Sequence, residues 1–169
     1  MAARSSAETA IGAVYLEATR IGIRRVHLPG AAPERRAAAD EVDAETAHHL
    51  EDAGEQIRRY AAGEQEILDF ALDWDGVEAT HRHVLETLCA IAPYGETVTY
   101  GELGRAAGVE DPRDIGVYMA RNPLPLVVPC HRVVASDGLG GYGGGLELKR
   151  TLLELEGVLP PRLDLGVAI

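Results

Sequence analysis

Residues 129–133 read Pro129-Cys130-His131-Arg132-Val133, and this pentapeptide holds the most reactive combination of side chains in the chain. A thiol becomes a strong nucleophile as its thiolate, and an adjacent base or cation favours that form. His131 can serve as that base, and Glu156 can orient its imidazole from the end of the last predicted helix. A cysteine can equally be a small core residue, as we expect for Cys89. The motif alone leaves both interpretations open.

Upstream of the pentapeptide, the sequence predicts two short helices joined by a tight turn, over residues 100–107 and 112–121. Thr99 is typical of an N-cap, and Glu102, three residues later, completes a capping box. Asn122-Pro123 ends the second helix. Two short helices with such a turn are the pattern of a helix-turn-helix, although helix pairs are common in other proteins.

The same half of the chain contains further predicted elements on both sides of this helix pair. They are a helix marked by Val84, Leu85, Leu88 and Ile91, an extended segment over 124–134 that carries Cys130, a glycine-rich loop over 138–145, and a final helix over 146–156 that ends at Gly157. This half is therefore expected to be mainly helical.

The first half of the chain favours a small sheet with one helix. Apolar and β-branched residues predict a hairpin over 10–19 and 22–29 and a third strand over 67–74; residues 30–43 predict a loop, and residues 44–62 a helix. We expect an α/β protein of two lobes: a small antiparallel-sheet N-terminal lobe over residues 1–76, and a mainly helical C-terminal lobe over 77–169 with a helix-turn-helix.

Composition limits the class of protein. Apolar residues make up 46% of the 169 and charged residues 25%, as in ordinary globular proteins. No stretch is long and apolar enough to span a membrane, and the start is not a secretory signal, so we expect a cytoplasmic protein. Two cysteines cannot form a disulfide framework. The histidines at 48, 49, 81 and 83 lie at no metal-ligand spacing from a cysteine, and we expect no metal site.

The net charge of −11 argues against a nucleic-acid partner. Most proteins that bind nucleic acids are basic, because phosphate contacts and counterion release supply much of their affinity. An acidic protein can bind DNA through a local patch, but such binding should be weak and strongly sensitive to salt.

Residues 95–157 resemble the C-terminal domain of the O6-alkylguanine-DNA alkyltransferases, the methylated-DNA–protein-cysteine methyltransferases. The resemblance rests on Gly95-Glu-Thr-Val-Thr-Tyr100-Gly, Arg113, Gly116, Asn122-Pro123, Pro129-Cys-His-Arg-Val133, Gly141-Tyr142, Gly144-Gly145-Leu146, Lys149, Leu152-Leu153 and Glu156-Gly157. It covers more than a third of the chain in order, whereas residues 10–76 resemble the variable N-terminal lobe of that family only in outline.

The resemblance implies DNA repair by a single-turnover suicide transferase, which moves the alkyl group of O6-alkylguanine in duplex DNA irreversibly onto Cys130 after base flipping. It implies no cofactor, no membrane partner and a monomer. The catalytic residues would be Cys130, His131, Glu156, Asn122 and Tyr100. The DNA-binding residues would be Arg113, Thr99, Gly116 and Arg121, with Arg113 as the arginine finger. The guanine pocket would be lined by Met119, Pro125, Val133, Tyr142 and Gly143.

The chain departs from the family pattern around the arginine finger. Glu110, Asp111 and Asp114 surround Arg113, where the family usually has small apolar residues, and carboxylates beside a phosphate backbone repel it. Tyr118 is bulkier than the usual residue, and residues 77–84 lack the family's usual Thr-x-Phe pattern. These changes predict weak or unusual DNA binding rather than lost chemistry.

Three other functions compete with alkyl transfer from duplex DNA. An alkyltransferase-like protein binds and senses the lesion but lacks the reactive cysteine, which this chain has. A diverged thiol acceptor would take a free-base or single-stranded substrate, or would sense redox state through Cys130. A Cys-His hydrolase needs access for water that the family pocket denies. Lys149, finally, either matches the family or lies on a solvated helix face.

Overall fold

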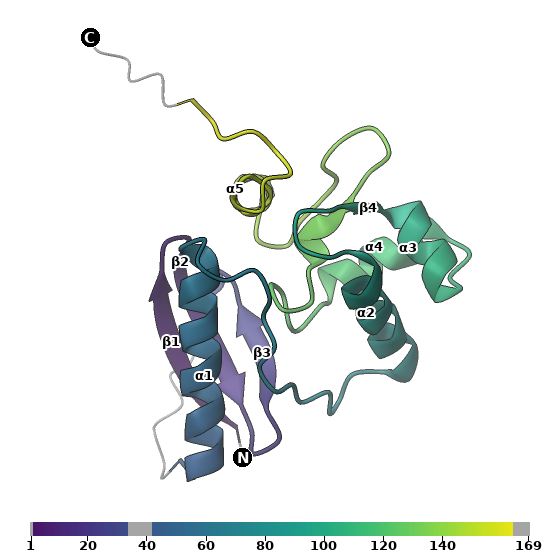
Figure 1. The fold of residues 1–169 in the computed structure, drawn as a ribbon. Helices are drawn as coiled ribbons and strands as arrows, with labels where there is room; N and C mark the ends of the chain where they lie inside the picture. Colours follow the sequence, from purple (N-terminus) through teal and green to yellow (C-terminus); the bar gives the residue numbers. More distant parts are fainter. Residues whose placement is uncertain (1, 34–41, 164–169) are drawn as a thin grey trace.

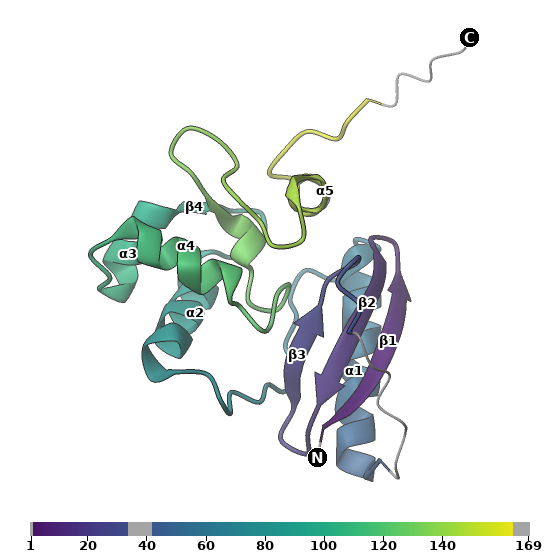
Figure 2. The ribbon, with the colours of Figure 1, turned by 180° about the vertical axis from the view of Figure 1, so that it is seen from behind.

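The computed structural model describes residues 2–33 and 42–163, and these form the two lobes that the sequence predicts. The N-terminal lobe is a three-stranded antiparallel sheet in the order β1-β2-β3, with one helix on its face (Figure 1). Its elements are β1 (Ala3–Thr9), β2 (Gly12–Ala18), β3 (Ile23–His27) and α1 (Ala44–Ala61). Figure 2 shows the sheet from the side opposite to α1. Most of the loop predicted over 30–43 lies outside the described residues.

The C-terminal lobe is mainly helical, with one two-stranded parallel pair between β4 and β5. Its elements are α2 (Ala79–Ile91), β4 (Val98–Thr99), α3 (Tyr100–Ala107), α4 (Pro112–Ala120), the 3-10 helix η1 (Cys130–Arg132), β5 (Val133–Val134) and α5 (Leu146–Leu155). The fold class predicted from the sequence is confirmed. The predicted boundary at residue 76 falls in the segment between α1 and α2 and stays a prediction.

One strand prediction is wrong, and one strand was not predicted. Strand β1 was missed, because its sequence ARSSAET is polar and has small side chains where a strand usually carries β-branched ones. Residues 67–74 form no strand, since only one bridge, between Ile23 and Leu72, joins them to the edge of β3. Their apolar pattern has another cause: Phe70 is buried in the core that the two lobes share.

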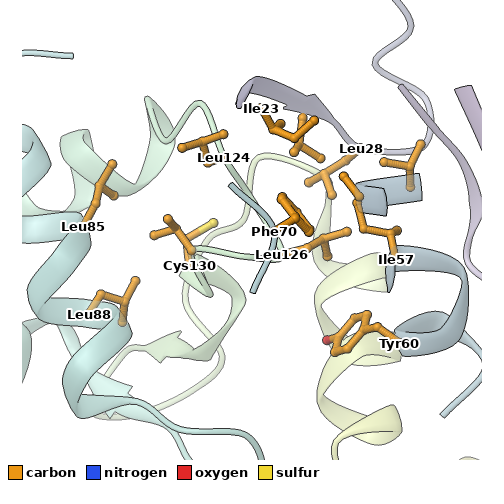
Figure 3. Packing of buried hydrophobic residues seen from close by; sticks show 14 of the residues in the cluster. Ile23, Leu28, Ile57, Tyr60, Phe70, Leu85, Leu88, Leu124, Leu126 and Cys130 are labelled. Carbon is orange, nitrogen blue, oxygen red and sulfur yellow. The ribbon is translucent and has the colours of Figure 1, made fainter. Parts of the chain in front are cut away.

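The two lobes share one hydrophobic core. The buried cluster includes Ile23 and Ile57 from the sheet lobe and Leu88 and Leu124 from the helical lobe, and Figure 3 shows them around Phe70. The backbone N–H of Val26 in β3 also donates to the carbonyl of Pro123, at 2.9 Å. The N-terminal lobe is thus packed directly against the segment that follows α4.

Helices α3 and α4 form the predicted helix pair, and the local signals explain their ends. The Thr99 hydroxyl accepts from the Glu102 N–H, and the Glu102 carboxylate accepts from the Thr99 N–H, so the predicted capping box is confirmed. Gly108 ends α3 with a φ of 74°, in the left-handed region that suits glycine. Asp111 caps α4, and Pro112 takes its first position.

Candidate active site

Cys130 lies on a tight turn rather than on the extended segment that the sequence predicted. The Arg132 N–H donates to the Pro129 carbonyl and the Val133 N–H to the Cys130 carbonyl, which makes η1 one turn of 3-10 helix. Only 7% of Cys130 is exposed. The turn thus holds two consecutive buried residues, Cys130 and His131.

Asn122 ties the end of α4 to this turn. Its side-chain amide donates to the Val128 carbonyl at 3.1 Å, and its oxygen accepts from the Leu124 N–H at 2.9 Å. Asn122 also hydrogen-bonds the Cys130 side chain. The residue that ends the second helix of the pair therefore helps to fix the nucleophile.

His131 and Glu156 form a fully buried pair between η1 and the end of α5. The imidazole Nε2 lies 2.7 Å from Glu156 Oε1, and both side chains are 0% exposed. Because a carboxylate can only accept, Nε2 must carry the proton, and Nδ1 is left as the basic nitrogen. Nδ1 is buried and has no hydrogen-bond partner among the described residues. The predicted orientation of His131 by Glu156 is thus present in the structure.

Arg132 supplies the positive charge for this carboxylate. Its guanidinium donates to Glu156 from Nε at 2.8 Å and from Nη2 at 2.9 Å, and Nη1 donates to the Ala92 carbonyl at 2.8 Å. Burial would raise the pKa of Glu156, but hydrogen bonds from His131 and Arg132 outweigh it and hold the pKa at about 2. Burial lowers the pKa of His131, against the pull of Glu156. At neutral pH the site therefore holds a neutral imidazole and a paired carboxylate.

Lys149 is a buried cation whose charge acts on the Cys130 thiol, and the solvated-face interpretation of this residue is wrong. It is 0% exposed, and its ammonium donates to the carbonyls of Val133, at 2.6 Å, and Gly141, at 3.0 Å. Burial lowers the pKa of Lys149 to about 8. Burial also raises the pKa of Cys130 to about 11, although Asn122 and the charge of Lys149 both lower it. The resting group is a thiol, so reaction requires a base.

Two tyrosines lie close to Cys130 along the glycine-rich loop. The Tyr100 hydroxyl is 3.5 Å from the Gly141 carbonyl, and a Cβ at Gly140 would lie 2.9 Å from the Tyr100 ring. The Tyr142 ring meets the His131 ring edge to face at 6.4 Å, and its buried hydroxyl has no partner among the described residues. Burial raises the pKa of both tyrosines, so both remain hydrogen-bond donors.

The remaining predicted pocket residues differ in their surroundings. Pro125 and Val133 are buried, Met119 is half-buried on α4, and Gly143 is exposed in the loop. The Val133 carbonyl already accepts from Lys149, and its second lone pair is the one left for a ligand. Among residues 2–33 and 42–163, no group of three or more histidine, cysteine or acidic side chains could hold a metal ion.

The predicted DNA-binding residues lie on and beside the helix pair. Arg121 is exposed at the end of α4, Gly116 is half-buried on it, and the Thr99 hydroxyl is occupied by its capping bond. The Arg113 side chain is 90% exposed, and its Nε and Nη2 donate to the Asp111 carboxylate at 2.8–3.1 Å. The neighbouring carboxylate therefore not only carries a charge that repels phosphate but also binds the Arg113 side chain.

Replacing Asp111 with asparagine should strengthen the DNA binding that the family resemblance implies about threefold to tenfold at low salt, because it frees Arg113 and removes a like charge from the phosphate side. Asparagine caps a helix as well as aspartate does, so α4 should persist. Fluorescence anisotropy with a labelled duplex measures the affinity, and Arg113→Ala should change it in the opposite direction. Glu64→Gln, an equal charge change on the other lobe, is the control; equal effects of the two would contradict this account.

The fold and the site together define a thiol protein with a buried Cys-His-Glu arrangement in a helix-turn-helix lobe, and comparisons with known proteins agree. A family model, the 6-O-methylguanine DNA methyltransferase DNA-binding domain, matches residues 79–158. The O6-methylguanine methyltransferase structure of Mycobacterium tuberculosis is 31% identical with a TM-score of 0.75, over 96% of this chain and 98% of that one. The chain belongs to the methylated-DNA–protein-cysteine methyltransferase family.

The relatives differ in name and in how much of them is matched. A methylated-DNA–protein-cysteine methyltransferase of Methanopyrus kandleri is 56% identical over 86 residues, which are 51% of this chain and 64% of that protein. A DNA base-flipping protein of Thermus thermophilus is 37% identical over 89% of this chain and 97% of its own length. The matches span about three fifths of the first curated methyltransferases, at 64%, 62% and 59% of their lengths.

Sequence reasoning gave no role in the site to Arg132, which donates to Glu156, and it missed Tyr60 altogether. Tyr60, in the N-terminal lobe, donates its hydroxyl to Glu156 Oε1 at 2.6 Å. The helical spacing of α1 indicated only that Tyr60 faces the core, and no local signal could reveal a partner 96 residues away.

Proposed function

We propose that the protein repairs duplex DNA by transferring the alkyl group of O6-alkylguanine irreversibly to Cys130, once per molecule and without a cofactor. The observation that carries the proposal is the buried thiol beside a neutral histidine whose Nε2–H is held by Glu156. That arrangement leaves Nδ1 of His131 to take the thiol proton, through a water molecule as the family resemblance implies. The protein would act as a monomer in the cytoplasm.

The reaction is a displacement at carbon. The Cys130 thiol gives up its proton as the sulfur forms a bond to the alkyl carbon, and the bond from that carbon to guanine O6 breaks. The electron pair stays on the leaving guanine, to which the Tyr100 hydroxyl would donate a proton or hydrogen bond. The product is a thioether, which water does not hydrolyse under these conditions, so each molecule would act once.

The substrate base must leave the duplex to reach a thiol that is 7% exposed, and unstacking costs a few kcal/mol. Arg113, whose side chain projects from α4, would fill the gap in the stack and offset part of that cost. Thr99, Gly116 and Arg121 would contact the DNA near it. The flipped guanine would lie among the residues proposed for the pocket, Met119, Pro125, Val133, Tyr142 and Gly143, where the Tyr142 hydroxyl is available to bond it.

Intact mass before and after mixing with a duplex that carries one O6-methylguanine tests the proposal. We expect the protein to gain one methyl group, mapped to the peptide that contains Cys130 and absent in Cys130→Ala. Cys89→Ser is the matched control. The expectation that Cys89 is a core residue is wrong, because it is exposed on α2, and its loss should leave transfer intact. No gain from the duplex, together with transfer from the free base O6-methylguanine, would instead support the diverged thiol acceptor.

Lesion sensing without repair is the second candidate function, because the Thermus thermophilus relative is named a DNA base-flipping protein rather than a methyltransferase. Flipping a base out of the duplex requires groups that bind the DNA and a side chain that fills the gap in the stack, but it does not require a nucleophile. Cys130 is present as a free thiol next to His131 in the chain, and His131 hydrogen-bonds Glu156, which favours repair. Binding of the methylated duplex with no mass gain at any pH would support sensing.

A further inference from the structure

Tyr60 is a buried tyrosine from the N-terminal lobe that reaches the proposed methyl-transfer site. It lies in the last turn of α1, is 1% exposed, and its ring meets the Tyr94 ring edge to face at 6.3 Å. Figure 3 shows it at the end of α1, beside the neighbouring helix of the other lobe. Its hydroxyl donates to Glu156 Oε1 at 2.6 Å and lies 3.4 Å from His131 Nε2.

We propose that Tyr60 is a positioning residue for Cys130 chemistry: it fixes the Glu156 carboxylate so that the carboxylate keeps His131 protonated at Nε2 and basic at Nδ1. This inference rests on the proposed function and adds the N-terminal lobe to it. The relay would then consist of groups from η1, α5 and α1 rather than from the C-terminal lobe alone.

The geometry at Glu156 supports this role. Oε1 accepts from Tyr60 at 2.6 Å, from His131 at 2.7 Å and from Arg132 at 2.9 Å, while Oε2 accepts from Arg132 at 2.8 Å. Three donors from two elements thus converge on one oxygen atom, and Tyr60 is the one from the other lobe. A carboxylate with so many fixed donors has little freedom to rotate, and His131 keeps its orientation with it.

The hydroxyl of Tyr60 also favours the required form of His131. Burial and the Glu156 charge raise the pKa of Tyr60, so the hydroxyl keeps its proton and donates it to the carboxylate. Its oxygen lone pairs then lie 3.4 Å from Nε2, where they favour an N–H over a bare nitrogen. Packing alone would need only the ring, because phenylalanine could meet Tyr94 equally well.

The charged and titratable groups around His131 determine what loss of the hydroxyl should do. Glu156 raises the pKa of His131, Arg132 and Lys149 lower it, and burial lowers it most. Cys130 is adjacent in the turn, and Tyr142 and Tyr60 face the ring from the loop and from α1. Without the Tyr60 donor, the Glu156 carboxylate would be less satisfied and would attract a proton on His131 more strongly. The acid limb of the rate profile should then move to higher pH.

The test compares Tyr60→Phe with Tyr94→Phe in a Cys89→Ser background. Each change removes one hydroxyl from the same pair of packed rings, but the Tyr94 hydroxyl donates to the Leu155 carbonyl instead of Glu156. Two rates are measured against pH: methyl transfer from the O6-methylguanine duplex, and alkylation of Cys130 by iodoacetamide. The second rate needs no DNA, so it reports on the relay even if the proposed function fails.

We expect Tyr60→Phe to slow both reactions about tenfold, as loss of a hydrogen bond to a charged group commonly does, and to move the acid limb to higher pH. Tyr94→Phe should stay within about twofold of the parent protein with the limb unmoved. Equal slowing by the two variants, or no change with Tyr60→Phe, would overturn the inference. If the parent protein transfers no methyl group, the proposed function fails, and the iodoacetamide rates still decide the role of Tyr60.

Discussion

Glu156→Gln should lower the free energy of unfolding by about 3 to 5 kcal/mol at neutral pH, the usual cost of removing one partner from a buried ion pair. Arg132 would keep its charge with a side chain only 10% exposed, and the Ala92 carbonyl would be its remaining strong acceptor. Glutamine has nearly the same shape as glutamate, so the change removes charge and acceptor capacity without opening a cavity.

The pH dependence of this loss has a definite sign. The pKa of Glu156 is about 2 in the folded protein, below the ordinary 4.5, because the hydrogen bonds from His131 and Arg132 outweigh the effect of burial. A carboxyl with a lower pKa in the folded than in the unfolded chain stabilises the fold above the unfolded pKa and loses that contribution as the pH falls. The parent protein should lose about 3 kcal/mol from this group between pH 4.5 and 2.

Urea unfolding at neutral and at acid pH measures both effects, with Glu154→Gln as the control. Glu154 lies two residues earlier, and its partners Arg150 and Arg162 are both partly exposed, so its loss should cost under about 1 kcal/mol. The stability gap between the parent and Glu156→Gln should narrow at acid pH. Methyl transfer should also fall sharply, because the neutral amide oxygen of glutamine would hold the Nε2–H of His131 less firmly than the Glu156 carboxylate does. Equal stability of the two variants at neutral pH would contradict the account.

Local signals predicted the parts of this fold that local interactions determine. The capping box at Thr99 and Glu102, the stop at Gly108 and the proline at the start of α4 are each properties of a few neighbouring residues, and all are present. The strand predicted over 67–74 is wrong because Phe70 packs into the core formed by residues far away in the sequence. Apolar residues that face such a core produce the same pattern as a strand.

The residues of the candidate site also differ in whether neighbouring residues or distant contacts determine their role. Cys130 and His131 were recognised because they are adjacent, and Glu156 because it ends the last predicted helix; the family resemblance then implied the same role for it. The Tyr60 hydroxyl and the Lys149 ammonium act across the fold, and their sequence patterns indicate only a core face and a helix position. The ion pair between Arg113 and Asp111 was not predicted either. The sequence indicated that the carboxylates near Arg113 would repel phosphate, but not that one of them binds the Arg113 side chain.

Lys149→Met should slow methyl transfer about tenfold or more at neutral pH, because it removes the cation that favours the Cys130 thiolate. Methionine retains most of the length and fills the same buried volume. The Val133 and Gly141 carbonyls would both lose a charged donor, at 2.6 and 3.0 Å, so the glycine-rich loop would lose its link to β5. The variant also avoids the cost of burying a charged ammonium, which offsets part of that loss. We therefore expect the free energy of unfolding to fall by about 1 to 3 kcal/mol.

The dependence of this effect on pH separates the charge of Lys149 from its hydrogen bonds. Because burial lowers its pKa to about 8, the ammonium of the parent protein loses its charge above that pH, while the neutral amine can still donate. The rate difference between the parent and Lys149→Met should therefore narrow as the pH rises through about 8. Arg150→Met, the next residue on α5 and partly exposed, should leave the rate unchanged. A gap that stays constant across this range would assign the role of Lys149 to holding the loop rather than to its charge.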